Sequence, residues 1–586
     1  METPTPFVLI DDATIQTDSR LYSDPVRVIS CYEPDQVAEI LAQIDQAIKD
    51  GFHVAGYLAY ELGYLLEPKL APLMDKGTDQ PLIWMGVFSG PQKQSREQTE
   101  ALMRDWAKMG HTITKPTTTQ SRAAYLGTVH TIQEHIRAGD VYQINYTFKQ
   151  NFEFSGSAKS LYAHLRQRQR ASYGAFLATE NQHIVSLSPE LFFESVGDVL
   201  RTRPMKGTAP RAARPSADVQ LREWLSQDEK SRAENLMIVD LLRNDMARIS
   251  EVGSVKVSDL FTVETYPTLH QMTSGIEAKL CPDTSFGTII RALFPCGSVT
   301  GAPKVKAMEI IHAREDGPRG VYTGAIGYAS ATDGVRFNVA IRTLTLDHQG
   351  HGEMGIGSGI VFDSKPMDEW AECHLKANFV TDAEQPPFEL LETLKWTPAA
   401  GFELLQRHLD RLQAACDYFC YPYDVPALKS ALDNAILDQT DVQRVRLTVD
   451  GQGSVLAQAH PLTAPSTMTY TIASQVVDTT SPFTYFKTTN RAFYDDARAS
   501  QEADEVLFLN AQGQLCEGSI SNVFVEKNGV LLTPPISCGL LNGTLRQDLL
   551  DSGKACEAIL TAADLAAPNR VFFGNSVRGL VKARPL

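Results

Sequence analysis

The chain is organised around the stretch Arg203-Pro204-Met205-Lys206-Gly207-Thr208-Ala209-Pro210-Arg211. A lysine between a proline and a glycine predicts a tight, stiff turn that presents the Lys206 amine at the wall of an anionic pocket. Burial and the flanking arginines would lower the pKa of that amine and make it a nucleophile or a base near neutral pH. A solvated basic loop is the alternative for this string by itself, so its surroundings must decide.

The composition indicates a globular protein. Its 586 residues are 43% hydrophobic and 21% charged, which is typical of soluble proteins with several domains. A formal net charge of -16 disfavours a general nucleic-acid binder, because no domain-wide basic field is available to displace counterions. Small anions can still bind to local arginines and lysines.

The sequence also predicts a cytoplasmic location without a membrane partner. The first residues, 1–5, lack the basic and apolar regions of a secretory signal, and no apolar run approaches the ~20 residues of a membrane span. Nine cysteines without a CxxC pair suit reduced thiols. Cys416 and Cys420 are one helical turn apart and are expected to face a core.

Periodicity predicts several helices and a break between two domains. Tyr125, Val129, Ile132 and Ile136 have helical spacing, and Gly139 supplies a stop. Further helices are expected at 235–249, opened by Ser231-Arg232-Ala233-Glu234, and at 305–313. The polar, proline-containing string 381–387 predicts a linker between a domain at 1–380 and a domain at 388–586.

Two carboxylates far apart in sequence, Glu234 and Glu372, are candidate ligands of Mg²⁺, which binds oxygen ligands and keeps several waters. Each has a structural alternative. Glu234 completes a capping box with Ser231, and Glu372 is spaced to pair with Lys376 within one helix.

Seven strings between residues 120 and 377 make this part resemble the chorismate-utilising enzyme family. They are Gly139-Asp140-Val141-Tyr142-Gln143, Ser188-Pro189-Glu190, Pro204-Met205-Lys206-Gly207-Thr208, the run from Glu234 to Asp245, Thr300-Gly301-Ala302-Pro303-Lys304, Ala340-Ile341-Arg342-Thr343 and Gly357-Ser358-Gly359-Ile360-Val361. The resemblance implies a large α/β (α+β) domain, a sandwich of two antiparallel sheets flanked by helices, which includes the first hundred residues.

Within that family, a lysine at position 206 resembles the aminodeoxychorismate synthase component I branch, in which it adds covalently to the substrate ring. Anthranilate synthases usually carry alanine there. The same match implies that Glu190 is the general acid, and that Glu234, Glu369 and Glu372 hold Mg²⁺. It implies these substrate-binding residues: His270, Thr300, Lys304, Tyr322, Arg342, Gly357, Ser358, Gly359 and Lys376. For His270, a satisfied core histidine is the alternative.

The resemblance implies attack of Lys206 at C2 of chorismate, loss of the C4 hydroxyl, entry of ammonia at C4 and expulsion of the lysine to give 4-amino-4-deoxychorismate. The chain contains no Gly-x-Cys-x-Gly-x-Gln string of a glutamine amidotransferase. Ammonia must therefore come from solution or from a separate glutamine amidotransferase subunit, and we expect the latter.

Four strings in the C-terminal part resemble class IV aminotransferases and, more closely, aminodeoxychorismate lyase, which implies a smaller α/β domain. They are His408-Leu409-Asp410-Arg411-Leu412, Phe486-Lys487-Thr488-Thr489-Asn490-Arg491, the run from Glu517 to Phe524 and the run from Gly539 to Arg546. The match implies that Lys487 holds pyridoxal 5'-phosphate and moves the substrate proton, and that Glu517 faces the pyridine nitrogen. Arg411, Thr544, Leu545 and Asn575 or Ser576 would bind the cofactor phosphate. The contacts on the substrate side stay unassigned.

Both halves together imply consecutive steps from chorismate to 4-aminobenzoate, a folate precursor. One alternative is an anthranilate-type or isochorismate-type first half joined to a transaminase for branched-chain or D-amino acids. Another is a catalytically inactive scaffold that binds a glutaminase.

Overall fold

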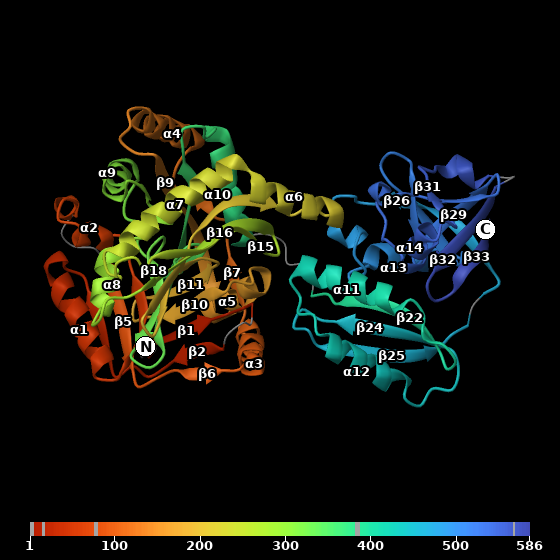
Figure 1. The fold of residues 1–586 in the computed structure, drawn as a ribbon, viewed down its shortest axis with the longest axis horizontal. Coiled ribbons are helices and arrows are strands. Elements are labelled where there is room, and N and C mark those ends of the chain that lie inside the picture. Colours follow the sequence, from red (N-terminus) through yellow and green to blue (C-terminus); the bar gives the residue numbers. More distant parts are fainter. Residues whose placement is uncertain (1–4, 15–17, 75–79, 381–386, 464, 567–568) are drawn as a thin grey trace. The chain divides into compact units, whose positions relative to one another are not determined.

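The computed structural model describes residues 5–14, 18–74, 80–380, 387–463, 465–566 and 569–586 (Figure 1). The predicted linker, 381–387, lies outside these residues except for Pro387. The chain forms two compact units. The first consists of Met1–Thr208, Leu225–Glu264 and Gln271–Ala383, and the second of Ala209–Trp224, Thr265–His270 and Glu384–Leu586.

Two large sheets form the first unit, which confirms the predicted two-sheet sandwich. The described residues build an 11-stranded sheet in the order β17-β9-β21-β20-β11-β10-β1-β2-β6, in which β7 and β8 also pair with β9. Its strands are β1 (Phe7–Asp11), β2 (Ser19–Tyr22), β6 (Gln92–Gln94), β7 (His111–Ile113), β8 (Thr117–Thr118), β9 (Gln143–Gly156), β10 (Tyr173–Ala178), β11 (Gln182–Ser188), β17 (Gly301–Ala302), β20 (Thr343–Asp347) and β21 (His351–Ile360).

The second, 10-stranded sheet has the order β14-β16-β13-β12-β19-β18-β4-β5-β3, with β15 paired to β16. Its strands are β3 (Arg27–Cys31), β4 (His53–Leu58), β5 (Ile83–Phe88), β12 (Leu191–Val196), β13 (Val199–Arg203), β14 (Met205–Pro210), β15 (Lys256–Thr265), β16 (Leu269–Lys279), β18 (Ala325–Ser330) and β19 (Gly334–Val339).

Helices cover these sheets with their apolar faces. The predicted helix at 125–136 is α4 (Arg122–Arg137), whose N-cap Ser121 accepts a hydrogen bond from the Ala124 amide. Gly139 follows it with a φ of 81°, which a glycine adopts without strain. Helices α4 and α10 (Pro366–Ala377) pack on each other and on β21. The other helices of the first unit are α1 (Val37–Lys49), α2 (Leu62–Leu66), α3 (Arg96–Ala107), α5 (Ala158–Arg168), α7 (Glu229–Ala247), α8 (Phe286–Leu293) and α9 (Lys304–Arg314). Helix α6 (Pro215–Gln227) divides between the units, since residues 215–224 belong to the second unit and residues 225–227 to the first.

Two local predictions were wrong. Lys206 lies in strand β14 and not on a tight turn, because this segment pairs with β16. Gly207 interrupts the extended backbone with a φ of 89°, which a glycine adopts without strain. Helix α7 begins before Ser231, since the Asp228 side chain is its N-cap and accepts from the Ser231 amide. Glu234 therefore completes no capping box with Ser231.

The second unit contains two further sheets. A four-stranded sheet has the order β23-β22-β24-β25, and an eight-stranded sheet of the described residues has the order β28-β27-β26-β33-β32-β29-β30-β31. The strands are β22 (Leu390–Thr397), β23 (Gly401–Phe402), β24 (Gln443–Val449), β25 (Val455–Pro461), β26 (Thr467–Val476), β27 (Glu505–Leu509), β28 (Leu515–Gly518), β29 (Asn522–Lys527), β30 (Val530–Thr533), β31 (Cys556–Glu557), β32 (Arg570–Asn575) and β33 (Gly579–Pro585). The helices are α11 (Leu405–Phe419), α12 (Val425–Ile436), α13 (Ala492–Ala499) and α14 (Thr544–Asp551).

Helix length bears on the expected absence of a membrane segment. In the part of the chain that the structure describes, no helix is both long enough and apolar enough to cross a bilayer.

Truncating a large side chain in the core of the first unit should lower the free energy of unfolding. Phe337 is fully buried and stacks on Phe193 with their ring centroids 5.6 Å apart. Phe337→Ala should lower the free energy of unfolding by about 3–5 kcal/mol, because lost burial and a residual cavity add. Urea denaturation followed by tryptophan fluorescence measures this. Val252→Ala, at a fully exposed position, is the control, and an equal loss in both variants would contradict the assignment.

Candidate functional sites

The amine of Lys206 belongs to a cluster of acids and one further lysine in the first unit. The residue is half-buried, and burial lowers the pKa of its amine. Glu234, Glu190 and Glu372 oppose this shift, while Lys376 adds to it. The Lys206 Nζ lies 3.3 Å from the position that a Cβ on Gly359 would take. Lys206 therefore faces the predicted Gly357–Gly359 wall.

The arginines that flank Lys206 in sequence have other partners. Arg203 pairs with Glu264 at 2.6 Å and with Asp259 at 3.1 Å, and Arg211 pairs with Asp218 at 2.8 Å. The prediction that these arginines lower the lysine pKa is not supported. The cation that acts on Lys206 is Lys376.

Glu190 is a buried carboxyl group with unused hydrogen-bonding capacity. It is 3% exposed, and burial raises its pKa to about 7 against the opposing hydrogen bond of Ser298 and the charge of Lys206. Its amide donates to Ser188 Oγ at 3.2 Å, and Ser188 Oγ donates to the Val339 carbonyl at 2.6 Å. Its Oε1 has no hydrogen-bond partner among the described residues. A carboxyl group with this pKa can donate a proton near neutrality.

Three carboxylates, Glu234 on α7 and Glu369 and Glu372 on α10, come together near Lys206. Burial raises the pKa of Glu234, and repulsion from Glu369 and Glu372 adds to the shift. Glu369 accepts from Ser364 Oγ at 2.7 Å, while Glu372 pairs with Lys376 at 2.7 Å. A divalent cation would relieve this repulsion, and Mg²⁺ commonly uses only one or two carboxylates.

The residues fit a Mg²⁺ site completed by waters or substrate oxygens. They do not form a ready-made cage, since the described residues contain no group of three or more His, Cys, Asp or Glu side chains placed to hold a metal. The pairing of Glu372 with Lys376 was the alternative that the sequence left open, and the structure contains it.

Gln143 is a further candidate site residue, at the end of the string Gly139-Asp140-Val141-Tyr142-Gln143, to which the sequence alone assigned no role. It is completely buried, and its side-chain oxygen and nitrogen lack partners among the described residues. Its Nε2 lies 2.3 Å from the position of a Cβ on Gly359. The signal was available, because strand alternation separates Gln143 from Tyr142. A buried amide without partners indicates a polar ligand.

The glycine strand β21 divides the predicted substrate residues between its two faces. A Cβ on Gly357 would meet the Tyr146 carbonyl at 2.5 Å, and Lys376 Nζ donates to the Gly357 carbonyl at 3.3 Å. Ser358 points to the opposite face, where its hydroxyl contacts the Tyr125 hydroxyl at 3.2 Å. Ser358 can therefore offer substrate only its backbone.

Other predicted substrate residues have protein partners. Lys304 Nζ lies 2.6 Å from Asp245, and His270 is 1% exposed between Asp218 at 3.0 Å and Thr265 at 3.1 Å. His270 also belongs to the second unit, whereas Lys206 belongs to the first. The structure thus contains the satisfied core histidine that the sequence left as the alternative.

Thr300, Tyr322 and Arg342 are likewise engaged. Thr300 Oγ1 donates to the Cys296 carbonyl at 2.9 Å, and Arg342 Nη1 donates to Gln169 at 2.8 Å. The Tyr322 ring occupies the space that a Cβ on Gly355 would take, at 2.0 Å. Their contact with substrate stays a prediction.

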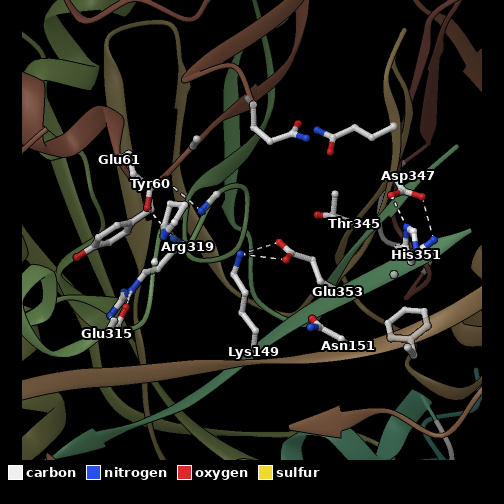
Figure 2. Close-up of a pocket in the computed structure, with 18 of the residues that line it drawn as sticks. Tyr60, Glu61, Lys149, Asn151, Glu315, Arg319, Thr345, Asp347, His351 and Glu353 are labelled. Carbon is white, nitrogen blue, oxygen red and sulfur yellow. Dashed lines mark hydrogen bonds and ion pairs between the residues drawn. The ribbon is translucent and has the colours of Figure 1, made fainter. Parts of the chain in front are cut away.

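A cavity of about 1070 Å³ in the first unit contains none of the predicted site residues. Figure 2 shows Lys149 pointing toward Glu353 and His351 toward Asp347, with nitrogen-to-oxygen distances of 2.9 and 3.0 Å. Arg319 and Glu315 form a further pair at 2.7 Å. The charged side chains labelled in this cavity thus largely neutralise one another.

Lys487 lines a separate cavity of about 410 Å³ in the second unit. Burial lowers the pKa of its amine to about 8, and the neighbouring cations Arg411 and Arg491 add to the shift. The Lys487 carbonyl accepts from the Leu391 amide at 2.9 Å, which fixes the backbone beside β22. The amine is therefore available as a nucleophile at moderately alkaline pH.

Glu517 faces the same cavity. Burial raises its pKa to about 8, although the Tyr494 hydroxyl and the Leu541 amide both donate to it at 3.1 Å. A cationic ring nitrogen would stabilise this buried carboxylate, as pyridoxal phosphate requires. Lys487 and Glu517 therefore fit the cofactor.

Most of the predicted phosphate-binding residues line the cavity. Helix α14 begins at Thr544, and Thr544, Arg411 and Asn575 line the cavity. Arg411 is held by Glu392 at 2.6 Å and by the Asn542 carbonyl at 3.1 Å. Leu545 does not line the cavity; its side chain packs in the core with Phe524. Leu545 can therefore contribute only its amide.

Two known protein families match the chain, one in each half. Residues 5–382 match the chorismate binding enzyme family. The chain belongs to this family. Residues 389–585 match the amino-transferase class IV family, so the domain that carries Lys487 is class IV aminotransferase-like.

Curated relatives share the first half. The chain is 41% identical over 258 residues to aminodeoxychorismate synthase component 1 of Klebsiella aerogenes, covering 44% of this chain and 57% of the relative. It is 39% identical over 287 residues to the Escherichia coli K12 protein of the same name, covering 49% and 61%. The chain therefore spans roughly six tenths of the length of these relatives.

A solved structure agrees with the fold. Anthranilate synthase component I from Streptococcus pneumoniae TIGR4 superposes with a TM-score of 0.53 and 25% identity, covering 65% of this chain and 93% of that one.

The lowered pKa of Lys487 predicts its reactivity. Labelling of this amine by acetic anhydride, followed by mass spectrometry, should be half-maximal near pH 8 and not near the ~10.4 of an ordinary lysine. Burial of the charged amine lowers the free energy of unfolding. This penalty is fully present below pH 8 and disappears as the pH rises toward 10.5, where the amine is neutral in the unfolded chain as well. Labelling of the urea-unfolded chain is the control. An unchanged midpoint on unfolding would contradict the burial argument.

Proposed function

We propose that the chain makes 4-aminobenzoate from chorismate in two steps at two sites. The observation that carries the proposal is that Lys206 and Lys487 both have pKa values lowered by burial, and each lies near a buried glutamate whose pKa is raised. Paired groups shifted in opposite directions are typical of acid–base and nucleophilic sites. The names of the relatives support the first step.

In the first step, the Lys206 amine attacks C2 of chorismate and Glu190 gives a proton to the departing C4 hydroxyl, which leaves as water. Ammonia then bonds to C4 as the lysine is expelled, and 4-amino-4-deoxychorismate results. Lys376 and the amides of Gly357 and Gly359 would bind the substrate carboxylates, because backbone N–H groups and cations both donate to them.

Mg²⁺ would be held by Glu234 and Glu372, with Glu369 nearby, and would neutralise substrate oxygens when bound. Ammonia would come from a separate glutamine amidotransferase. These two proposals rest on the family and on the carboxylate cluster.

In the second step, pyridoxal phosphate supplies an electron sink when it is bound at Lys487. The Lys487 amine takes the proton from the substrate carbon that bears the amine. Glu517 would keep the ring nitrogen protonated, and Thr544 and Arg411 would bind the phosphate. Loss of pyruvate then leaves the aromatic 4-aminobenzoate, and aromatisation drives the step forward.

The rival first step is anthranilate formation. A lysine at position 206 disfavours it, because anthranilate forms by addition of ammonia to the ring and needs no covalent bond to an amine of the protein. Incubation with chorismate, ammonia and Mg²⁺ followed by chromatography separates the two products. Anthranilate as the sole product would refute the proposal.

Removal of the first amine predicts a loss of product. Lys206→Ala should reduce formation of 4-amino-4-deoxychorismate by at least about 10³-fold, or divert the chain to anthranilate-like product, because no other nucleophile replaces it. Product chromatography measures this, and Lys256→Ala, at an exposed position, is the control. Unchanged output from Lys206→Ala would refute the covalent role.

Removal of the second amine predicts accumulation. Lys487→Ala should leave the first step intact, so that 4-amino-4-deoxychorismate builds up while pyruvate release falls by at least about 10³-fold. A lactate dehydrogenase-coupled assay follows pyruvate, with the exposed Lys554→Ala as control. Pyruvate release at the normal rate would contradict the assignment.

A further inference from the structure

The cavity around Lys487 is strongly cationic. Besides the lysine it is lined by six arginines, whereas only two of its lining residues carry carboxylates, Asp495 and Glu517. The arginines are Arg411, Arg444, Arg446, Arg491, Arg498 and Arg578. One phosphate group, held near Arg411 and α14, leaves most of this charge unanswered.

Two of the arginines already serve the protein. Arg411 is tied to Glu392 at 2.6 Å. Arg491 is tied to Asp495 at 2.9 Å and donates to the Ser519 carbonyl at 2.6 Å. The cavity's own aspartate is thereby neutralised.

Three others form what we call the arginine triad: Arg444, Arg498 and Arg578. None of them makes an ion pair with a carboxylate of the described residues. Asp504 and Glu505 attract Arg578 only at longer range. They are engaged elsewhere, Asp504 with the Thr469 hydroxyl at 2.9 Å and Glu505 with the Ser519 hydroxyl.

The triad is assembled from three separate elements. Arg444 lies on β24 between the buried Gln443 and Val445, so strand alternation turns it to the cavity face. Arg498 lies near the end of α13. Arg578 follows β32 in a turn fixed by Asn575, whose Oδ1 accepts from the amides of Val577 at 3.1 Å and Arg578 at 2.9 Å.

The guanidinium group of Arg578 is repelled by the other two. Burial lowers the pKa of Arg578, and the charges of Arg498 and Arg444 add to the effect. Gathering like charges beside a cavity destabilises the fold unless an anion enters. A carboxylate suits this place, because guanidinium groups bind it through paired hydrogen bonds.

We propose that the arginine triad receives a second carboxylate of the substrate, remote from the reacting amine, so that this site selects a cyclic dicarboxylate over a monocarboxylate amino acid. The inference rests on the proposed function, since 4-amino-4-deoxychorismate carries two carboxylates. It names the substrate-side contacts that the sequence left unassigned.

Binding of an unreactive dicarboxylate tests the triad. Isothermal titration of the protein, with and without pyridoxal phosphate, should give at least tenfold tighter binding of isophthalate than of benzoate. Arg444→Gln, Arg498→Gln and Arg578→Gln should each weaken isophthalate binding about 10- to 100-fold, the range expected for a lost charged hydrogen bond. Arg498→Lys should retain part of the affinity.

The controls separate the triad from the cofactor and from the reaction. Cofactor absorbance and retention should be unchanged in the three glutamine variants, and Arg584→Gln, at an exposed position outside the cavity, should bind like the parent. Equal affinity for isophthalate and benzoate would overturn the inference. Loss of cofactor with isophthalate binding intact would do so as well, because the triad would then hold phosphate. Triad-dependent isophthalate binding without any pyruvate release would refute the proposed function alone.

Discussion

The backbone pairing of β9 with β21 is the constraint on which the first site depends. Ten residue pairs join these strands, from His351 opposite Glu153 to Ile360 opposite Ile144. This length fixes the register, so Gly359 must lie across from Asn145, and next to Gln143 and Lys206. A Cβ at Gly359 would displace the side-chain amide of Gln143. The site is thus a flat stretch of backbone with an amine held above it.

Burial then decides the chemistry of the groups around that backbone. The same desolvation that lowers the pKa of Lys206 raises those of Glu190 and Glu234. Burying these charged groups destabilises the fold, and the apolar surface buried in the surrounding sandwich core offsets that loss. The second unit repeats the arrangement with Lys487, in a loop, and Glu517, on β28. Two independent folds therefore reach a reactive amine by the same physical route.

The two sites differ in how they treat surplus charge. Near Lys206, opposite charges are mixed, and Lys376 offsets Glu372 within one helical turn. Near Lys487 the cations dominate, and the arginine triad lacks carboxylate partners among the described residues. A mixed site can accommodate a metal and an anion together, whereas a cationic site favours anions alone. This contrast supports different ligands for the two halves.

Short-range patterns in the sequence determined much of this protein. Helix α4 and the two-sheet architecture were readable because each depends on neighbouring residues or on a dense set of strings. Tertiary structure alone decided that Lys206 lies on a strand, that Asp228 caps helix α7, and that Ser358 turns away from the glycine face. It also decided that Lys304 and His270 contact buried aspartates, Asp245 and Asp218, and that Arg444, Arg498 and Arg578 line one cavity. The reason is physical: sheet register, desolvation and ion pairing depend on groups distant in sequence, and no local pattern encodes which of them will meet.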